Sequence, residues 1–376
     1  MNGRERILAA LNHEEADRIP LTDYLWTATA ERWHQEGIPE DVTPAEYFGY
    51  ENAAFDADTS PRFPVEVVGE DEEYVTMRDF YGGLRRNHKD FTTTPHIIDF
   101  SVKTRDDWLR IKSRLEAGPD RVDWNGDWPE RPYDDGNTFL SLRCTTANGG
   151  LPGYRKARAE GKYIQYEAYV GVDKIQWYTG TERILTIMID DPEWARDMFD
   201  TDADLAIRQY QIMVEGGFEF DGAHLVNDMG YRNTLLFSPK LYDKVLRPSI
   251  QRLISYFKRQ GLKVTMHSCG SVYKLMSRLI EDGLDGLDPL ETKAANMDLI
   301  ELKKEFGDRL TLVGGIDVRA MADPDPSAIE DEIRNKIPFV KRGGGYIYAS
   351  DHSVPNNVSL EQYKRVIELV HHYGKY

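Results

Sequence analysis

The sequence has few cysteines, no long apolar run and no cluster of basic residues, and each absence excludes a class of protein. Two cysteines, Cys144 and Cys269, among 376 residues are too few for a disulfide-bonded scaffold and suit a reducing cytosol. No apolar run reaches the roughly 18 residues that a membrane-spanning helix needs. Residues 1–6 include an acid, Glu5, and lead into no uninterrupted apolar segment, so we expect no signal peptide and a cytoplasmic location.

The charge balance also limits the partners. The chain has 47 basic and 64 acidic residues, which gives a net charge of −17. A nucleic-acid backbone would be repelled unless the basic residues gathered on one face, and no Lys/Arg cluster long enough for that is present. We therefore expect a small molecule or a protein as partner, with no nucleic acid and no membrane. The composition leaves the oligomeric state open, a homodimer included.

From about residue 161 the chain repeats a strand–helix unit. Helix starts are marked by Asp191-Pro192 and Ser238-Pro239, where a capping side chain precedes a first-turn proline. Alternating strands and helices predict a parallel sheet, and the number of units favours a (β/α)₈ barrel. An open doubly wound sheet is the alternative, but no glycine-rich phosphate loop follows any strand. The expected strands cover residues 163–170, 222–226, 263–266, 286–287, 310–313 and 345–349.

The N-terminal part contains a segment of a different style. Valines and other apolar residues alternate with polar ones on both sides of the Gly69–Glu72 turn, which is typical of antiparallel strands. We expect residues 60–105 to form a small β-meander inserted near the barrel mouth. The whole chain, residues 1–376, is then one barrel domain carrying this insertion.

Polar residues gather where the predicted strands end. In a (β/α)₈ barrel the carboxyl ends of the strands form the active site, so these residues are expected to converge. The residues concerned are Asn227, Asp228, His267, Cys269, Asp288, Glu291, Asp317, Asp351 and His352.

The His267-Ser268-Cys269 segment is the sharpest of these features. Residues i and i+2 of an extended chain project to the same side, so the imidazole and the thiolate can bind one zinc ion. The alternative is a buried cysteine beside a histidine with its own partners. A catalytic zinc needs a third protein ligand, which Asp351 or His352 can supply from another strand end. Cys144 is expected to be a free structural thiol.

These segments resemble the uroporphyrinogen decarboxylase superfamily over nearly the whole chain. The resemblance implies a (β/α)₈ barrel. The matching motifs are Asp17-Arg18-Ile19-Pro20, Gly180-Thr181-Glu182, Asn227-Asp228-Met229-Gly230, Leu236-Phe237-Ser238-Pro239, His267-Ser268-Cys269-Gly270, Gly314-Gly315-Ile316-Asp317 and Gly344-Gly345-Tyr346-Ile347.

The superfamily holds two kinds of enzyme. True decarboxylases carry an arginine-bearing segment after the first strand, which grips the substrate carboxylates. The matching residues 21–29 contain no arginine, and Asp23 is expected to repel such a substrate. The decarboxylase interpretation is therefore disfavoured.

The second kind comprises zinc-dependent methyltransferases that exchange a methyl group with a corrinoid protein. Members acting on thiols have a His-x-Cys pair and a later cysteine as zinc ligands. Here the later position falls in Ser350-Asp351-His352, without cysteine. Alignment on Pro355 favours Asp351 as the third ligand. The segments 71–79, 100–104 and 350–355 resemble the branch that demethylates methoxylated aromatic compounds.

The leading hypothesis is a zinc-dependent O-demethylase component that passes the methyl group of an aryl methyl ether to a corrinoid. Asp228 or Tyr231 is expected to orient the ring or deliver a proton, and Trp26, Asn227 and Trp177 to bind the substrate. The corrinoid is expected on a partner protein, because no Asp-x-His-x-x-Gly cobalt-ligand motif is present. Two alternatives are a metal-free decarboxylase-like enzyme acting on a smaller acid and a non-catalytic barrel that binds a corrinoid protein or a pigment.

Overall fold

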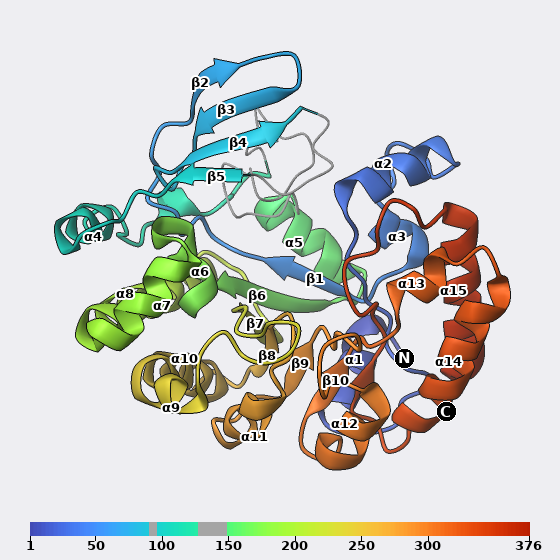
Figure 1. Ribbon diagram of the computed structural model, residues 1–376. Helices are drawn as coiled ribbons and strands as arrows, with labels where there is room; N and C mark the ends of the chain where they lie inside the picture. The colour runs from blue at the N-terminus through green and yellow to red at the C-terminus, as the bar shows by residue number, and fades with distance from the viewer. Residues whose placement is uncertain (90–95, 127–148) are drawn as a thin grey trace.

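A parallel sheet forms the centre of the molecule. A computed structural model describes residues 1–89, 96–126 and 149–376. Its strands pair in parallel in the order β1-β6-β7-β8-β9-β10-β11, each beside its successor (Figure 1). They are β1 (Asn52–Phe55), β6 (Tyr163–Tyr169), β7 (Gly222–Val226), β8 (Lys263–His267), β9 (Gly286–Asp288), β10 (Thr311–Val313) and β11 (Tyr346–Ile347).

The segment around Leu21 closes this sheet into a barrel. On one side, the Tyr348 amide donates to the Pro20 carbonyl and the Thr22 amide to the Tyr348 carbonyl, both at 3.0 Å. On the other side, the Glu51 amide donates to the Leu21 carbonyl at 3.0 Å. The segment therefore takes the eighth strand position between β11 and β1. The expected (β/α)₈ barrel is confirmed, and the open-sheet alternative is wrong.

A separate antiparallel sheet lies between β1 and β6 in the chain, inside the expected meander. It pairs in the order β2-β3-β4-β5 (Figure 1). The Arg85 guanidinium of β4 lies 4.7 Å from the ring centre of Trp177, which follows β6. The sheet is thus attached on the carboxyl-end side of the barrel. Its strands are β2 (Glu66–Glu70), β3 (Tyr74–Arg78), β4 (Leu84–His88) and β5 (His96–Asp99).

Helices surround the barrel, and several start where the sequence indicates. The side chain of Asp191 accepts from the Trp194 amide, and Ser238 accepts from the Leu241 amide at 3.2 Å. The bounds are α1 (Gly3–Leu11), α2 (Thr27–Gln35), α3 (Pro44–Phe48), α4 (Arg105–Lys112), η1 (Pro119–Arg121), α5 (Gly150–Ala159), α6 (Gly171–Thr179), α7 (Thr181–Asp190), α8 (Pro192–Glu215), α9 (Pro239–Leu241), the π-helical turn η3 (Tyr242–Leu246), α10 (Arg247–Arg259), α11 (Tyr273–Glu281), α12 (Leu299–Phe306), α13 (Val318–Ala322), α14 (Pro326–Val340) and α15 (Leu360–Tyr373).

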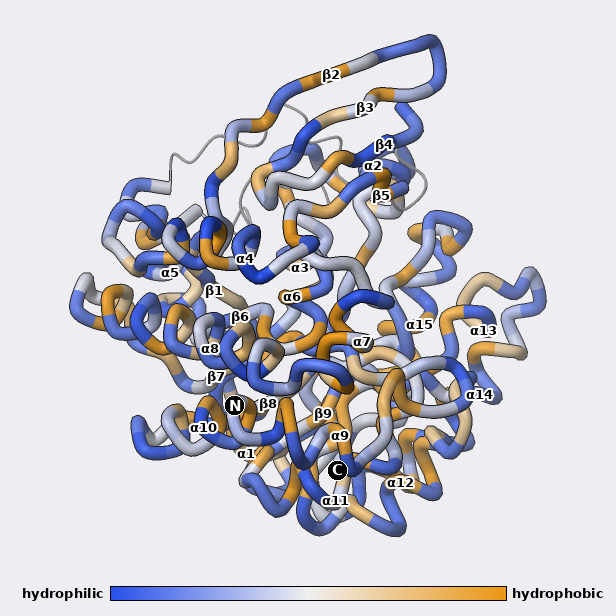
Figure 2. Tube along the Cα trace, turned by 60° about the vertical axis from the view of Figure 1, so that its left-hand side comes forward, coloured by the Kyte–Doolittle hydropathy of each residue, from blue (hydrophilic) through white to orange (hydrophobic). Residues whose placement is uncertain are grey.

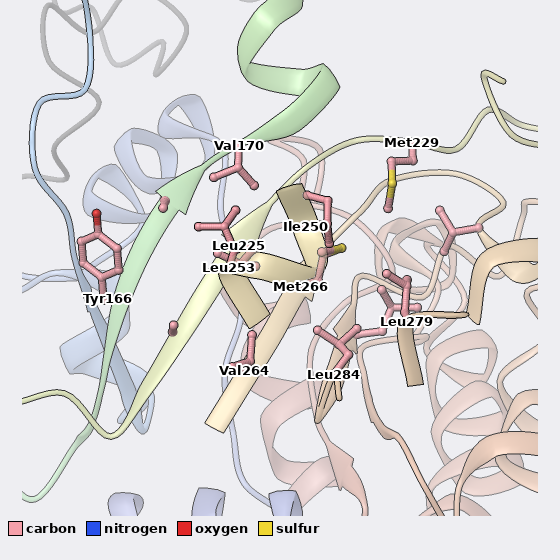
Figure 3. Close-up of a cluster of buried hydrophobic side chains, with 14 of the residues drawn as sticks. Tyr166, Val170, Leu225, Met229, Ile250, Leu253, Val264, Met266, Leu279 and Leu284 are labelled. Atoms are coloured by element: carbon pink, nitrogen blue, oxygen red, sulfur yellow. The ribbon is translucent and has the colours of Figure 1, made fainter. Parts of the chain in front are cut away.

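Along each strand, successive side chains point alternately outward, toward the helices, and inward, into the barrel. In β8, Val264 and Met266 are fully buried among the side chains of the surrounding helices, in the cluster that includes Ile250 and Leu253 (Figure 3). Thr265 and His267 alternate with them and therefore face the barrel interior. Along the described part of the trace, apolar stretches alternate with hydrophilic ones, many of which lie toward the outside (Figure 2).

The barrel interior is apolar at its amino-terminal end. Ile7 and Leu11 of α1 pack against Tyr163, Val313 and Ile347, so α1 closes this end. The polar interior residues lie above this floor, toward the carboxyl ends of the strands. None of the helices in the described ranges is both long and apolar enough to cross a lipid bilayer.

Candidate active site at the mouth of the barrel

Several of the polar residues predicted at the strand ends meet at the barrel mouth. His267 ends β8 and Asp288 ends β9, while Asp228 follows β7 by two residues. These three strands are adjacent, with Val226 opposite His267 and His267 opposite Asp288. The neighbouring strand ends therefore bring an imidazole, a thiol and several carboxylates within reach of one another.

His267 and Cys269 point toward each other. The Nε2 atom of His267 lies 3.4 Å from the Cys269 Sγ atom. The other ring nitrogen, Nδ1, donates to Asp288 Oδ1 at 2.9 Å. That bond fixes the ring and leaves Nε2 directed at the thiol. Hydrogen bonds from a carboxylate to the far nitrogen are usual for metal-binding histidines, because they set both tautomer and orientation.

Burial and neighbouring charges shift the titration of this pair. Burial raises the pKa of the Cys269 thiol to about 12, against the opposing effect of His267. Burial alone would lower the pKa of His267, but its hydrogen bonds to Asp288 and Cys269 raise that pKa well above the ordinary value. The thiol thus ionises readily only beside added positive charge, which a bound cation would provide.

Oxygen and nitrogen donors complete two candidate ligand groups around Cys269. Asp228, His267 and Cys269 form one, and Cys269, Glu291 and His352 form the other, with the ligand atoms of each within 4.8 Å of one another. Asp228 Oδ1 also accepts the Cys269 amide at 2.8 Å and lies 3.7 Å from His267 Nε2. A set of one thiolate, imidazole nitrogen and carboxylate oxygen suits zinc, so the residues present fit this metal.

Of the two predicted third ligands, the structure brings His352 toward Cys269 and turns Asp351 elsewhere. Asp351 is completely buried and lies 3.1 Å from the Lys293 Nζ atom. It also accepts the Val318 amide at 3.1 Å. His352 is half-buried, and its ring stacks near Trp26 with centroids 6.3 Å apart and planes 21° apart. Within the described residues, Asp351 belongs to neither of the ligand groups around Cys269.

The other predicted site residues are spread over the mouth. Asn227 is fully buried, and its Oδ1 accepts the Asp173 amide at 3.3 Å. Trp177 is half-buried beneath the antiparallel sheet, with its ring 5.4 Å from that of Tyr81. Tyr231 is 64% exposed on the turn after β7, so its side chain lies at the rim. Cys144 lies outside the described residues.

Asp23 is placed differently from the expectation that it faces a substrate. It is buried, and its Oδ2 accepts from the Tyr363 hydroxyl at 2.6 Å and the Ser350 hydroxyl at 2.8 Å. Burial raises the pKa of this carboxyl to about 6, although these hydrogen bonds oppose the shift. Asp23 therefore joins the first strand segment to Ser350, which follows β11, and to Tyr363 of α15. Its carboxylate faces these two residues and not a substrate.

A layer of polar residues inside the strands was not predicted from the sequence. Glu167 of β6 lies opposite His224 of β7, which in turn lies opposite Thr265 of β8. His224 Nδ1 is 2.8 Å from Thr265 Oγ1 and 3.7 Å from Asp288 Oδ2. Burial raises the pKa of Glu167. The polar residues Gln165 and Glu167, two apart in an otherwise apolar strand, were the signal that could have revealed this inward face.

Comparison with known proteins agrees with this architecture. A methyltransferase from Methanosarcina mazei superposes with a TM-score of 0.63 over 99% of both chains, at 16% identity, which shows a shared fold. A uroporphyrinogen decarboxylase from Mannheimia succiniciproducens is 23% identical over 200 residues, 51% of this chain. That alignment spans about half of the relative, 52% of its length. The model of the uroporphyrinogen decarboxylase family matches residues 176–373, more than half of the sequence. The chain therefore belongs to the uroporphyrinogen decarboxylase family.

Proposed function

We propose that the protein is a zinc-dependent methyltransferase that removes the methyl group of an aryl methyl ether and passes it to the reduced cobalt of a partner corrinoid protein. The observation that supports this most directly is the convergence of His267 Nε2 and Cys269 Sγ at 3.4 Å. Two ligands of one tetrahedral zinc at about 2.0–2.3 Å are separated by a similar distance. The barrel and its antiparallel insertion would act as one domain.

The proposed zinc ligands are His267, Cys269 and a third group from the second cluster. His352 and Glu291 both lie near the thiol, whereas Asp351 is held by Lys293. Of the two residues that the sequence offers as third ligand, we therefore propose His352, which shares a ligand group with Cys269 but not with His267, in place of Asp351. Glu291 Oε1 accepts the Gly270 amide at 2.8 Å, so Glu291 holds the loop on which Cys269 lies.

Bound zinc would supply Lewis acidity at the ether oxygen, where negative charge develops as the carbon–oxygen bond breaks. The chain's own residues do the rest. Asp288 holds the His267 ring in place, and Trp26 with His352 offers a flat surface for an aromatic ring. Asp228, partly exposed beside His267, is the carboxyl placed to exchange a proton with the departing phenolic oxygen.

The methyl acceptor is proposed to come from a separate protein. The chain shares its fold with a methyltransferase, at a TM-score of 0.63 and 16% identity, and a methyltransferase reaction is compatible with that fold. The decarboxylase alternative has less support, because residues 21–29 carry no arginine and Asp23 is turned into the protein.

Metal analysis and methyl transfer test the proposal together. Purified protein should hold about one zinc per chain and should methylate reduced cobalamin when supplied with methoxyphenols, detected by the cobalamin spectrum. Cys269→Ser should lose both zinc and transfer, while Ser353→Ala, a neighbour of the site outside the ligand groups, should keep both. Protein that binds no zinc, or zinc-loaded protein that transfers methyl from no ether, would rule the function out.

A further inference from the structure

We propose that the site selects aromatic ethers without a carboxylate and discriminates against methoxybenzoates. This inference concerns the substrate class and rests on the proposed function. It is carried by the distribution of charge around the mouth, where acidic side chains are concentrated and the cations beside them are already engaged.

Acidic groups line the site on several sides. Asp228 lies 3.7 Å from His267 Nε2, and Asp288 bonds the opposite side of the same ring. Glu291 reaches the loop of Cys269 through the Gly270 amide. Below them, the Glu167 side chain is buried. An added carboxylate would meet these groups at short range in a partly desolvated cavity, where like charges repel strongly.

The cations in the segments around this layer are held by other groups or lie at the exposed rim. Lys293, two residues beyond Glu291, lies 3.1 Å from Asp351 and 3.7 Å from Asp317. Lys174 is completely buried and donates to the Thr59 hydroxyl at 2.8 Å. Arg232 is exposed on the rim turn, outside the buried layer. In the described part of the chain, no cation near His267 thus offers the bidentate clamp that carboxylate recognition favours.

A bound metal does not reverse the excess of negative charge around the site. A divalent cation brings two positive charges, but the Cys269 thiolate and a single ionised carboxylate, Asp228 or Glu291, already offset them. The Trp26–His352 pair meanwhile offers a stacking surface, with ring planes 21° apart, that fits a flat neutral ring. The site therefore combines an aromatic surface with a negative surround, which suits an uncharged ring.

A pair of ligands of equal shape isolates the effect of charge. The affinities of zinc-loaded protein for 3-methoxybenzamide and 3-methoxybenzoate would be measured by calorimetry at pH 7.5 in low salt. The amide should bind at least tenfold more tightly, and the ratio should fall as salt is added. An acid that binds as tightly as the amide, or more tightly, would overturn the proposal, as would binding of neither ligand.

A variant connects the discrimination to Lys293. Asp317→Asn removes one acid beside Lys293 while keeping an acceptor for the Arg319 amide in the first turn of α13; it also removes the ion pair between Asp317 and the exposed Arg319 side chain. It should bind the benzoate several-fold more tightly than wild type and leave amide binding unchanged. Asp331→Asn, an exposed partner of Arg334 on α14, is the matched control and should change neither. An unchanged benzoate affinity in Asp317→Asn would contradict the charge argument.

The proposed function can fail separately from this inference. If the function is wrong, no ether, charged or neutral, transfers its methyl group to reduced cobalamin. If only the inference is wrong, transfer occurs but the benzoate is used as well as the benzamide.

Discussion

At the scale of single residues, Asp351 and His352 follow each other in the chain but project to different surroundings. Asp351 is completely buried against Lys293, whereas His352 approaches Cys269 and Glu291. We expect His352→Ala to weaken zinc binding at least tenfold, measured by competition with a chelator. Asp351→Asn should keep its zinc and instead lose on the order of 2–4 kcal/mol of unfolding free energy in urea, because Lys293 loses its buried partner. Zinc loss in Asp351→Asn alone would return the third-ligand role to Asp351.

Asp288 is a positioning residue, because it acts on the metal through His267. Removing the Nδ1 partner in Asp288→Ala should lower zinc affinity about 10- to 100-fold, the usual effect of losing such a hydrogen bond. Asp288→Asn keeps an acceptor and should recover part of that affinity. In the cobalt(II)-substituted protein the thiolate-to-metal absorption band should persist, since Cys269 is unchanged. Loss of this band in Asp288→Ala would show that the whole site had collapsed.

Asp23 predicts how stability depends on pH. Burial raises its pKa from an ordinary 3.8 to about 6 in the folded state, so folding favours the protonated form. The contribution of this carboxyl is therefore most favourable below about pH 4, falls as pH rises through 6 and stays low above it. The shift corresponds to about 3 kcal/mol. Urea unfolding from pH 4 to 7.5 should show the free energy of Asp23→Asn rising relative to wild type by up to that amount. A difference that is constant with pH would contradict the assignment.

At the scale of elements, α8 depends on the residue that begins it. The Asp191 side chain accepts from the Trp194 amide at the N-terminus of α8 and binds the Arg105 guanidinium, with Nε to Oδ2 at 3.0 Å. Asp191→Ala should reduce the unfolding free energy by about 1–2 kcal/mol, as expected for loss of an N-cap and a bidentate partner. Its exposed neighbour provides the control, since Asp190→Ala should change stability by less than about 0.5 kcal/mol. Equal effects in the two variants would argue against the cap.

The elements also show what the sequence could predict. The strands β6, β7 and β8 and the start of α8 were predictable because apolar runs and capping residues are local signals. The strand β1, with the sequence Asn52-Ala53-Ala54-Phe55, carries little such signal and is defined by its parallel pairing with β6. The His267–Cys269 contact followed from the period of two.

The orientation of Asp351 and His352 did not follow from the sequence. A one-residue change of register exchanges the two sides of an extended chain, so alignment on Pro355 could not decide which of them faces the thiol. The inner residues Glu167 and His224 were missed for a related reason. They lie within strands, where a polar residue is visible only once the inward face of the barrel is known.

At the scale of the whole molecule, the N-terminal segment holds the amino-terminal end of the barrel together. Arg6 of α1 pairs with Glu51 and also binds Asp17 at 2.7 Å. Glu51 accepts the Leu21 amide at 2.8 Å and pairs with Arg18 at 2.9 Å. The side chain of Glu51 thus joins α1, the eighth-strand segment and the start of β1. This network and the apolar floor fix the end of the barrel that lies opposite the site.

The pairing of β1 with β6 has a consequence for the order of folding. These strands are hydrogen-bonded neighbours, yet the whole stretch from Asp56 to Lys162, antiparallel sheet included, separates them in the chain. Bringing such distant segments together costs more chain entropy than joining β6, β7 and β8, which follow one another through shorter, helical connections. During refolding, pulsed hydrogen exchange should therefore show amides of β7 and β8 protected before the Tyr163 amide, which bonds Glu51. Simultaneous protection would mean that the barrel closes in one concerted step.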